Sequence, residues 1–160
     1  MAAQLDYGFS TPKGVPGGKV DISYDNVVTR INEESDGVMK FGYAVVKGAS
    51  AGTGVKLPTS AATKDNFEGV VLHAENTEHD LNGKVKIKKD ATLGIMRHGH
   101  VWGRIDSAAA PAYGATAYVI TDAEAGEVGT FTNTATEGKT VDIGAKFGVE
   151  SDTGIAVIEL

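Results

Sequence analysis

The sequence predicts a mainly β protein, an antiparallel sandwich or a small barrel, with an extended N-terminal arm and at most one short helix. Short segments in which apolar and polar residues alternate recur between Phe67 and Leu160, and this period of two is typical of strands with one buried face. The segments between them are rich in Gly, Asn, Asp and Pro, which favour turns. Glycine makes up 21 of the 160 residues, well above its usual share of ~7%.

The C-terminal segment shows the alternation most clearly. Positions 141, 143, 145, 147 and 149 are all apolar, whereas Asp, Gly, Lys and Gly lie between them. A turn is expected at 150–154, followed by a last strand at 155–160. Two apolar segments joined by a short turn predict an antiparallel hairpin.

Further strands are expected along the chain, and their spacing is typical of an all-β sandwich or barrel. They lie at 38–47, 68–73, 83–88, 93–97, 100–105, 115–121 and 129–133. In the first of these, apolar residues would share one face, namely Met39, Phe41, Tyr43 and Val45. The glycine-rich residues 48–54 predict a hairpin turn. Residues 59–66, with Thr59 or Ser60 as the N-cap, predict one or two turns of helix.

The N-terminal residues differ from the rest, and we divide the chain into an arm at 1–37 and a β-domain at 38–160. Residues 9–18 contain two prolines and three glycines, a composition that cannot continue a helix or a central strand. An acidic turn lies at 32–37. Between these segments a short strand is expected, in which three apolar residues alternate with polar ones: Val20, Ile22 and Tyr24. Two interpretations remain open, an extended arm that lies on a surface, or a strand and loop of the same barrel.

Composition and charge argue against several classes of function. The net charge is −6, whereas binding to a nucleic-acid backbone needs clustered Lys and Arg. The basic run at 84–89 alternates with apolar residues and predicts the solvated face of a strand. Cysteine is absent, which excludes disulfides and Cys-based zinc sites. No signal peptide is visible, and the longest apolar run, 41–46, is far shorter than the ~20 residues that span a bilayer. We therefore expect a protein made in cytoplasm, with no nucleic-acid or membrane partner.

The motifs of chemical interest each have a simpler structural interpretation. His98 and His100 could share a face and chelate a metal, but Gly99 between them predicts a turn or bulge. The stretch 48–56 lacks the Gly-Lys-Ser/Thr ending of a phosphate loop. There is no Gly-x-Ser-x-Gly nucleophile motif, and the acidic pairs lie in turns. We expect no enzymatic activity, no metal site and no cofactor.

The single tryptophan has three possible roles. Trp102 and Arg104 would lie on one face of their strand, whereas Val101 and Ile105 would lie on the other. An aromatic side chain beside an arginine is typical of an interface anchor. The same tryptophan could instead belong to the core of a sheet that is covered on both sides, or form a platform on which a sugar stacks.

Several stretches form a pattern that extends over nearly the whole chain. In order they are KGVPGGKVD (13–21), TRINEE (29–34), KFGYAVV (40–46), KLP (56–58), FEGVV (67–71), GIMRHGHVW (94–102), PAYG (111–114) and the closing hairpin. In this collinear order they resemble the structural cement proteins, or capsid decoration proteins, of tailed bacteriophages. Each stretch alone is weak evidence for the family, because it consists of glycines and a hydrophobic pattern and contains no catalytic residues.

The resemblance implies a non-enzymatic protein of the virion, located on the outer capsid surface and made in the host cytoplasm. Its partner would be the major capsid protein, whose assembled shell it would bind from outside, bridging neighbouring subunits. The resemblance also implies self-association, with a trimer as one form. A small carbohydrate-binding β-module is the alternative, with Trp102 and several tyrosines as platforms, namely Tyr7, Tyr43, Tyr113 and Tyr118.

An extended arm suits such a role, because it can add a strand to the sheet edge of a neighbour. Prolines and glycines would let the arm follow a surface, and its apolar side chains would anchor it. A weak contact that is repeated many times over a shell gives strong overall attachment. The residues expected to contact the capsid are Pro12, Val15, Pro16, Gly17, Gly18, Val20, Ile22, Tyr24, Trp102 and Arg104.

Overall fold

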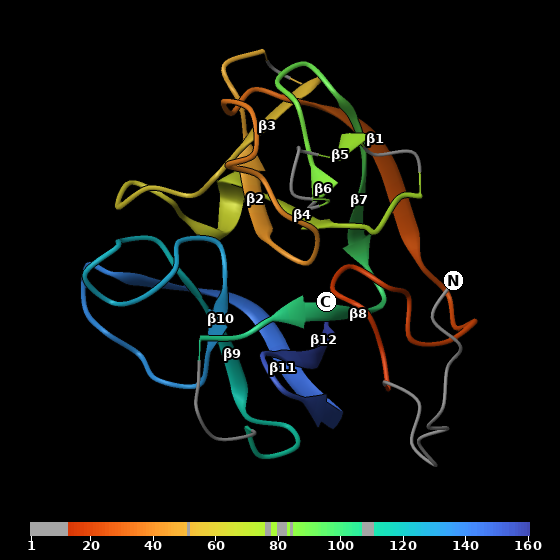
Figure 1. The fold of residues 1–160 in the computed structure, drawn as a ribbon. Coiled ribbons are helices and arrows are strands. Elements are labelled where there is room, and N and C mark those ends of the chain that lie inside the picture. The colour runs from red at the N-terminus through yellow and green to blue at the C-terminus, as the bar shows by residue number, and fades with distance from the viewer. Residues whose placement is uncertain (1–12, 51, 76–77, 80–82, 84, 107–110) are drawn as a thin grey trace.

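The computed structural model describes residues 13–160 except 51, 76–77, 80–82, 84 and 107–110. Two groups of strands make up the fold, a closed barrel and a second sheet that lies below it in Figure 1. The prediction of a mainly β fold with at most one short helix is confirmed. Among the described residues the helical structure is limited to one 3-10 turn, η1, at Lys64–Asn66. None of their helices is long and apolar enough to cross a membrane.

Five strands close the barrel in the order β1-β3-β2-β4-β7. They are β1 (Asn26–Asn32), β2 (Ala44–Lys47), β3 (Gly54–Lys56), β4 (Phe67–Val71) and β7 (Thr92–His98). β1 runs parallel to β3, and the other neighbouring strands are antiparallel. A separate two-stranded ribbon, β5 (Glu78–His79) with β6 (Val85–Lys86), precedes β7 in the chain.

The second sheet has the strand order β10-β9-β11-β12-β8. Its members are β8 (His100–Arg104), β9 (Thr116–Ile120), β10 (Phe131–Thr132), β11 (Thr140–Asp152) and β12 (Ile155–Glu159). β11 and β12 form the antiparallel hairpin that the C-terminal alternation predicts, with Asp152 opposite Ile155. A bridge between Ile105 and Phe131 connects the end of β8 to β10 at the other edge.

The barrel and the second sheet share one hydrophobic core. Its largest cluster joins buried residues of the barrel, such as Val70 and Met96, to buried residues of the second sheet, such as Val101 and Phe147. A second cluster fills the barrel around Val45 and contains Met39 and Phe41 as well. Because the first cluster crosses from one group of strands to the other, the two pack as one unit.

Glu68 is a charged residue buried in the barrel, with only 4% of its surface exposed. Arg30 of β1 donates from Nε to Glu68 Oε1 at 2.7 Å, and Arg97 of β7 binds the same carboxylate oxygen. The two arginines therefore compensate the charge of Glu68, and the three side chains link β1, β4 and β7. Such a group is costly to disrupt, because removal of one partner leaves an unpaired charge.

Three local predictions are wrong. The helix expected at 59–66 is only the 3-10 turn Lys64–Asn66, and its N-cap is Thr63 rather than Thr59 or Ser60. Val20, Ile22 and Tyr24 do not form a strand, although Lys19 makes an isolated bridge to Val101. Residues 38–43 are turn and irregular structure, because Gly42 adopts a φ of 80° and strand β2 begins only at Ala44. The apolar residues predicted to share a face there are nevertheless buried, namely Met39, Phe41, Tyr43 and Val45.

The segment assigned to the N-terminal arm contains a strand of the barrel. β1 spans Asn26–Asn32 and pairs with β7 along most of its length. Asn32 is fully buried, and its side chain donates to the carbonyl of Lys88 at 2.8 Å. Residues 13–25 precede this strand and lie against β8 of the second sheet.

Candidate functional site

Residues 13–20, called the docked arm below, run along the outer edge of β8. Gly17 donates its backbone N–H to the carbonyl of Trp102 at 2.7 Å, and Trp102 donates its own to the carbonyl of Gly18 at 2.9 Å. Val20 donates to the carbonyl of His100 at 3.1 Å. The docked arm thus satisfies backbone groups of an edge strand that would otherwise be open to pairing with another chain.

The side chain of Trp102 is buried beneath the docked arm. Only 3% of its surface is exposed, and it packs with Ile155, Val157 and the partly buried Val20. Gly14 lies directly over the indole, where a Cβ atom would come within 2.4 Å of three ring atoms. Of the three roles left open for Trp102, the structure therefore supports a core residue, and the surface that the arm covers is the chain's own sheet.

Residues 21–25, called the presentation loop below, connect the docked arm to β1 and expose large apolar side chains. Ile22 is fully exposed, and Tyr24 is 79% exposed. The backbone N–H of Ser23 donates to Asp21 Oδ1 at 3.0 Å, which closes a tight turn with Ile22 at its tip. This turn replaces the predicted strand, because an aspartate two residues before a serine can bond to its backbone in a local turn.

Two histidines hold the presentation loop against the β7–β8 connection. His100 Nδ1 lies 2.7 Å from Asp21 Oδ2, and the ring of His98 lies 5.9 Å from the ring of Tyr24. The Ser23 hydroxyl and His100 lower the pKa of Asp21 to about 2. An ion pair between Lys19 of the docked arm and Asp25 closes the loop at its base. The loop is thus fixed by contacts at its base while Ile22 faces solvent.

The two histidines were the residues of chief chemical interest in the sequence. Over the described residues, no group of three or more His, Cys, Asp and Glu side chains is arranged to hold a metal. His98 and His100 instead contact Tyr24 and Asp21. Gly99 between them has a φ of 123°, as expected of a turn or bulge. The sequence alone did not reveal that the histidines hold the presentation loop, because Asp21 and His100 lie 79 positions apart.

The structure brings most of the predicted contact residues together, but exposes only some of them. Val15 is 49% exposed on the docked arm, Pro16 and Gly18 are half-buried, and Gly17 is buried. Pro12 lies outside the described residues. Arg104, at the end of β8, is half-buried and lines a hollow whose other walls come from residues 37–41 and 85–87.

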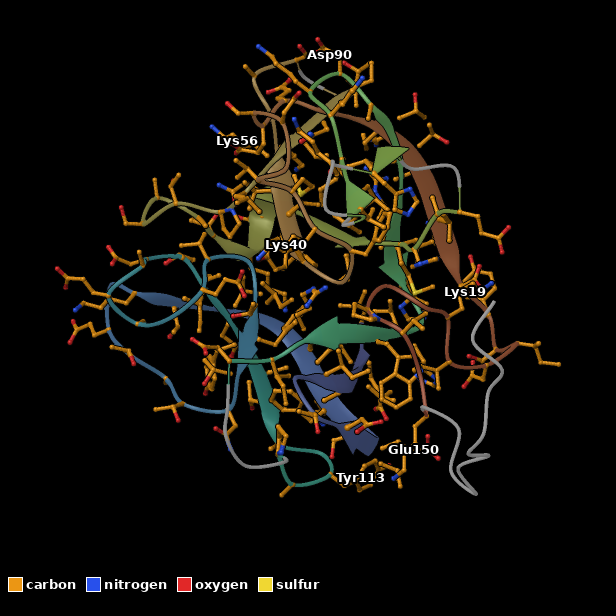
Figure 2. The ribbon with its side chains drawn as sticks, in the orientation of Figure 1. Lys19, Lys40, Lys56, Asp90, Tyr113 and Glu150 are labelled. Atoms are coloured by element: carbon orange, nitrogen blue, oxygen red, sulfur yellow. The ribbon has the colours of Figure 1, made fainter. Side chains whose placement is uncertain are left out.

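Two of the aromatic residues proposed as sugar platforms are enclosed in the core. Trp102 and Tyr43 are both buried, so neither ring can stack on a sugar in this structure. Tyr113 is exposed at the far end of the second sheet (Figure 2). Tyr7 lies outside the described residues.

Comparison with known proteins assigns the chain to a family. Residues 3–160 match the family described as Structural cement protein (E217 gp24/Pam3 gp6). The chain belongs to the structural cement protein family of phages. This membership supports a structural, capsid-stabilising role, and it confirms the resemblance that the collinear stretches indicate. The match extends over the arm and the β-domain alike.

A solved structure described as the capsid of Myoviridae phage XM1 contains a chain of similar fold. The TM-score is 0.71, with 16% sequence identity, and the similarity covers 99% of this chain and 97% of that one. At this identity the comparison concerns the fold alone. Nothing among the curated proteins matches the sequence.

Proposed function

We propose that this chain binds the outside of an assembled phage shell, contacts the major capsid protein there and stabilises the shell by bridging neighbouring subunits. The proposal rests on family membership together with one structural observation. The presentation loop holds two large apolar side chains, Ile22 and Tyr24, in solvent while its base is fixed to the second sheet. After synthesis in the host cytoplasm, the chain would add to a shell that has already formed.

The physical basis is burial of apolar surface by a loop that is already ordered. Full burial of an isoleucine side chain contributes about 1.5–3 kcal/mol. A loop fixed in place loses little conformational entropy on binding, so more of this free energy is retained as affinity. Repetition of the contact over a shell multiplies its effect.

The docked arm has a different role in this proposal from the one expected of a free arm. Its backbone groups pair with β8, so it supports the presentation loop and covers Trp102. Val15 remains exposed on it and would extend the apolar contact toward a shell subunit. Self-association, with a trimer as one form, would place several such loops on one unit.

Co-sedimentation of the purified chain with undecorated shells tests this proposal. Ile22→Ser and Tyr24→Ala should each weaken binding by about tenfold or more, because exposed anchors of this kind carry much of the affinity of an interface. Val149→Ser is the matched control, since Val149 is 79% exposed on β11, beside Glu150 at the lower end of the second sheet (Figure 2). If Ile22→Ser and Tyr24→Ala bind shells as tightly as Val149→Ser and the unmodified chain do, the role of the presentation loop is overturned. If the unmodified chain does not bind shells, the proposed function is overturned.

A further inference from the structure

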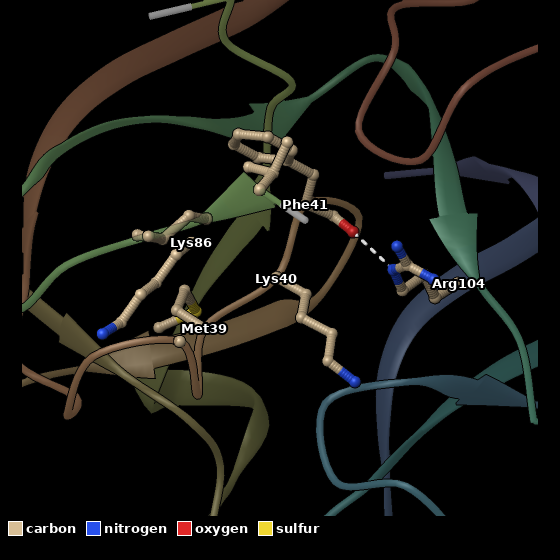
Figure 3. A pocket seen from close by; sticks show the side chains of 8 residues that line it. Met39, Lys40, Phe41, Lys86 and Arg104 are labelled. Atoms are coloured by element: carbon tan, nitrogen blue, oxygen red, sulfur yellow. Dashed lines mark hydrogen bonds between the residues drawn. The ribbon is translucent and has the colours of Figure 1, made fainter. Parts of the chain in front are cut away.

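A hollow of about 640 Å³ lies between the irregular segment 37–41, residues 85–87 at the β5–β6 ribbon, and Arg104 at the end of β8. Its walls include the buried apolar side chains of Met39, Phe41 and Ile87. Three cationic side chains also line it, from Lys40, Lys86 and Arg104 (Figure 3). A recess with apolar walls and a few convergent polar groups is typical of a binding site.

Two of the three cations are already paired. Lys40 forms an ion pair with Glu127, and Lys86 Nζ lies 3.4 Å from Asp36 Oδ2. Arg104, by contrast, makes no ion pair with any residue that the structure describes. Three cations therefore face two carboxylates, which leaves about one positive charge in excess, and the charge of Arg104 also helps to lower the pKa of Glu127.

Arg104 is held in place by backbone groups. Its Nε donates to the carbonyl of Phe41 at 2.9 Å (Figure 3), and its backbone N–H donates to the carbonyl of Gly42 at 3.0 Å. The Nε bond orients the guanidinium group, and within the part of the chain that the structure describes the two terminal nitrogens make no hydrogen bond. Two terminal guanidinium nitrogens match the two oxygens of a carboxylate, and such paired bonds are stronger than single neutral ones.

We propose that this hollow receives the carboxylate of an aspartate or glutamate from a protein subunit of the shell, with Arg104 as its principal partner. The inference rests on the proposed function, and it identifies a second contact besides the presentation loop. A single carboxylate suits the charge, because the three cations of the hollow exceed the two neighbouring carboxylates by one. A nucleic acid does not suit the hollow, because binding to its phosphate backbone needs many clustered cations. This chain, by contrast, carries a net charge of −6.

The neighbouring acidic residues narrow the choice of partner segment. Asp36 and Glu127 lie close to Lys86 and Lys40 at the hollow, so a run of several carboxylates would meet like charges there. One acidic residue flanked by neutral or apolar residues would avoid this repulsion. Its aliphatic carbons would lie against Met39 and Phe41 while its oxygens reach Arg104.

Binding of variants to undecorated shells tests this assignment. Arg104→Gln should weaken binding by about tenfold or more, because the carboxylate would then be buried without a charged partner. Arg104→Lys should recover part of the loss, since it restores the charge without the planar pair of donors. Lys146→Gln is the control for charge, because Lys146 is exposed on β11 and does not line the hollow. It should bind as the unmodified chain does.

A second variant separates loss of contact from loss of fold. Arg104→Gln removes the bond to Phe41, so its melting temperature must be compared with that of the unmodified chain. Lys86→Glu leaves that bond intact and reverses a charge at the hollow, and it should also weaken binding. Binding of Arg104→Gln and Lys86→Glu at the strength of the unmodified chain would overturn the inference while leaving the proposed function in place. Failure of the unmodified chain to bind shells would overturn the proposed function itself.

Discussion

Gly14 and Trp102 are in such close contact that no side chain fits between them. A Cβ atom added to Gly14 would lie 2.2 Å from Cε2 of the indole. The tryptophan is thus covered by backbone, and its burial depends on the docked arm. Since Trp102 is the only tryptophan in the chain, its fluorescence reports on whether the arm is in place.

Gly14→Ala should displace the docked arm from β8. The added methyl group cannot be accommodated by the buried indole, so the arm must move and Trp102 becomes hydrated. We expect a red shift of the tryptophan emission, with little change in the β signal of the circular dichroism spectrum. Gly94→Ala is the control, because a Cβ there meets its neighbours at ordinary contact distances of 3.7 Å or more. Unchanged emission from Gly14→Ala would contradict the arrangement of the arm.

Deletion of residues 2–24 should abolish shell binding and leave the β-domain folded. The barrel begins at Asn26, beyond the deleted segment. The deletion removes Ile22 and Tyr24 and uncovers Trp102, so the truncated chain should show red-shifted emission and a lower melting temperature. Circular dichroism, fluorescence and co-sedimentation with shells check these three consequences. Full occupancy of shells by the truncated chain would show that the arm and loop are dispensable.

The contact between Asp21 and its neighbours should depend on pH in the acidic range. Ser23 and His100 lower the pKa of Asp21 from the usual 3.8 to about 2. These bonds therefore favour the folded loop fully at any pH above 3.8, the pKa that Asp21 has in the unfolded chain. As the pH falls from about 4 to 2, that contribution is progressively lost. An NMR titration of the Asp21 carboxyl carbon should give a midpoint near 2. Ser23→Ala should raise the midpoint, because the Ser23 hydroxyl is the largest cause of the shift. A midpoint near 3.8 in the unmodified chain would contradict the hydrogen bonds described here.

Glu68→Ala should destabilise the barrel by about 2–4 kcal/mol. Removal of the carboxylate leaves Arg30, with 14% of its side chain exposed, without its partner. Arg97 is more exposed, with 39% of its side chain accessible. Water can therefore replace part of the interaction that Arg97 loses when the carboxylate is removed. Urea unfolding followed by circular dichroism measures the change in the free energy of unfolding. Glu150→Ala, at an exposed position, should change it by less than about 0.5 kcal/mol. A similarly small effect of Glu68→Ala would show that the buried group contributes little.

The strands that the sequence predicted best are those with several buried apolar residues between clear turn signals, including β8, in which both Val101 and Trp102 are buried. β7, β8 and β9 each lie within about one residue of the expected range. β1 was missed because only Val28 among its apolar residues packs against the barrel core, and the other inward positions are polar. Its apolar residues Val27 and Ile31 are 43% and 41% exposed, whereas Asn32 is buried. Polar residues that are satisfied by distant partners give no local signal of burial.

Bulges and long-range contacts explain the remaining differences. Val149 continues the alternation of β11, yet it is 79% exposed, because the register shifts between Phe147 and Ser151. The composition of residues 9–18 left open an extended arm on a surface or a strand and loop of the barrel, and it could not reveal that residues 13–20 lie along β8. The presentation loop likewise depends on the contact between Asp21 and His100, which local sequence does not encode.

The temperature at which shells release their DNA, measured with and without the purified chain, tests the capsid-stabilising role most directly. Undecorated shells that have taken up the chain to saturation should release DNA at a higher temperature than bare shells. Ile22→Ser should reduce both the amount bound at a given concentration and the rise in temperature. Release at the same temperature with the chain bound, or a chain that stays in the supernatant, would contradict a capsid-stabilising role.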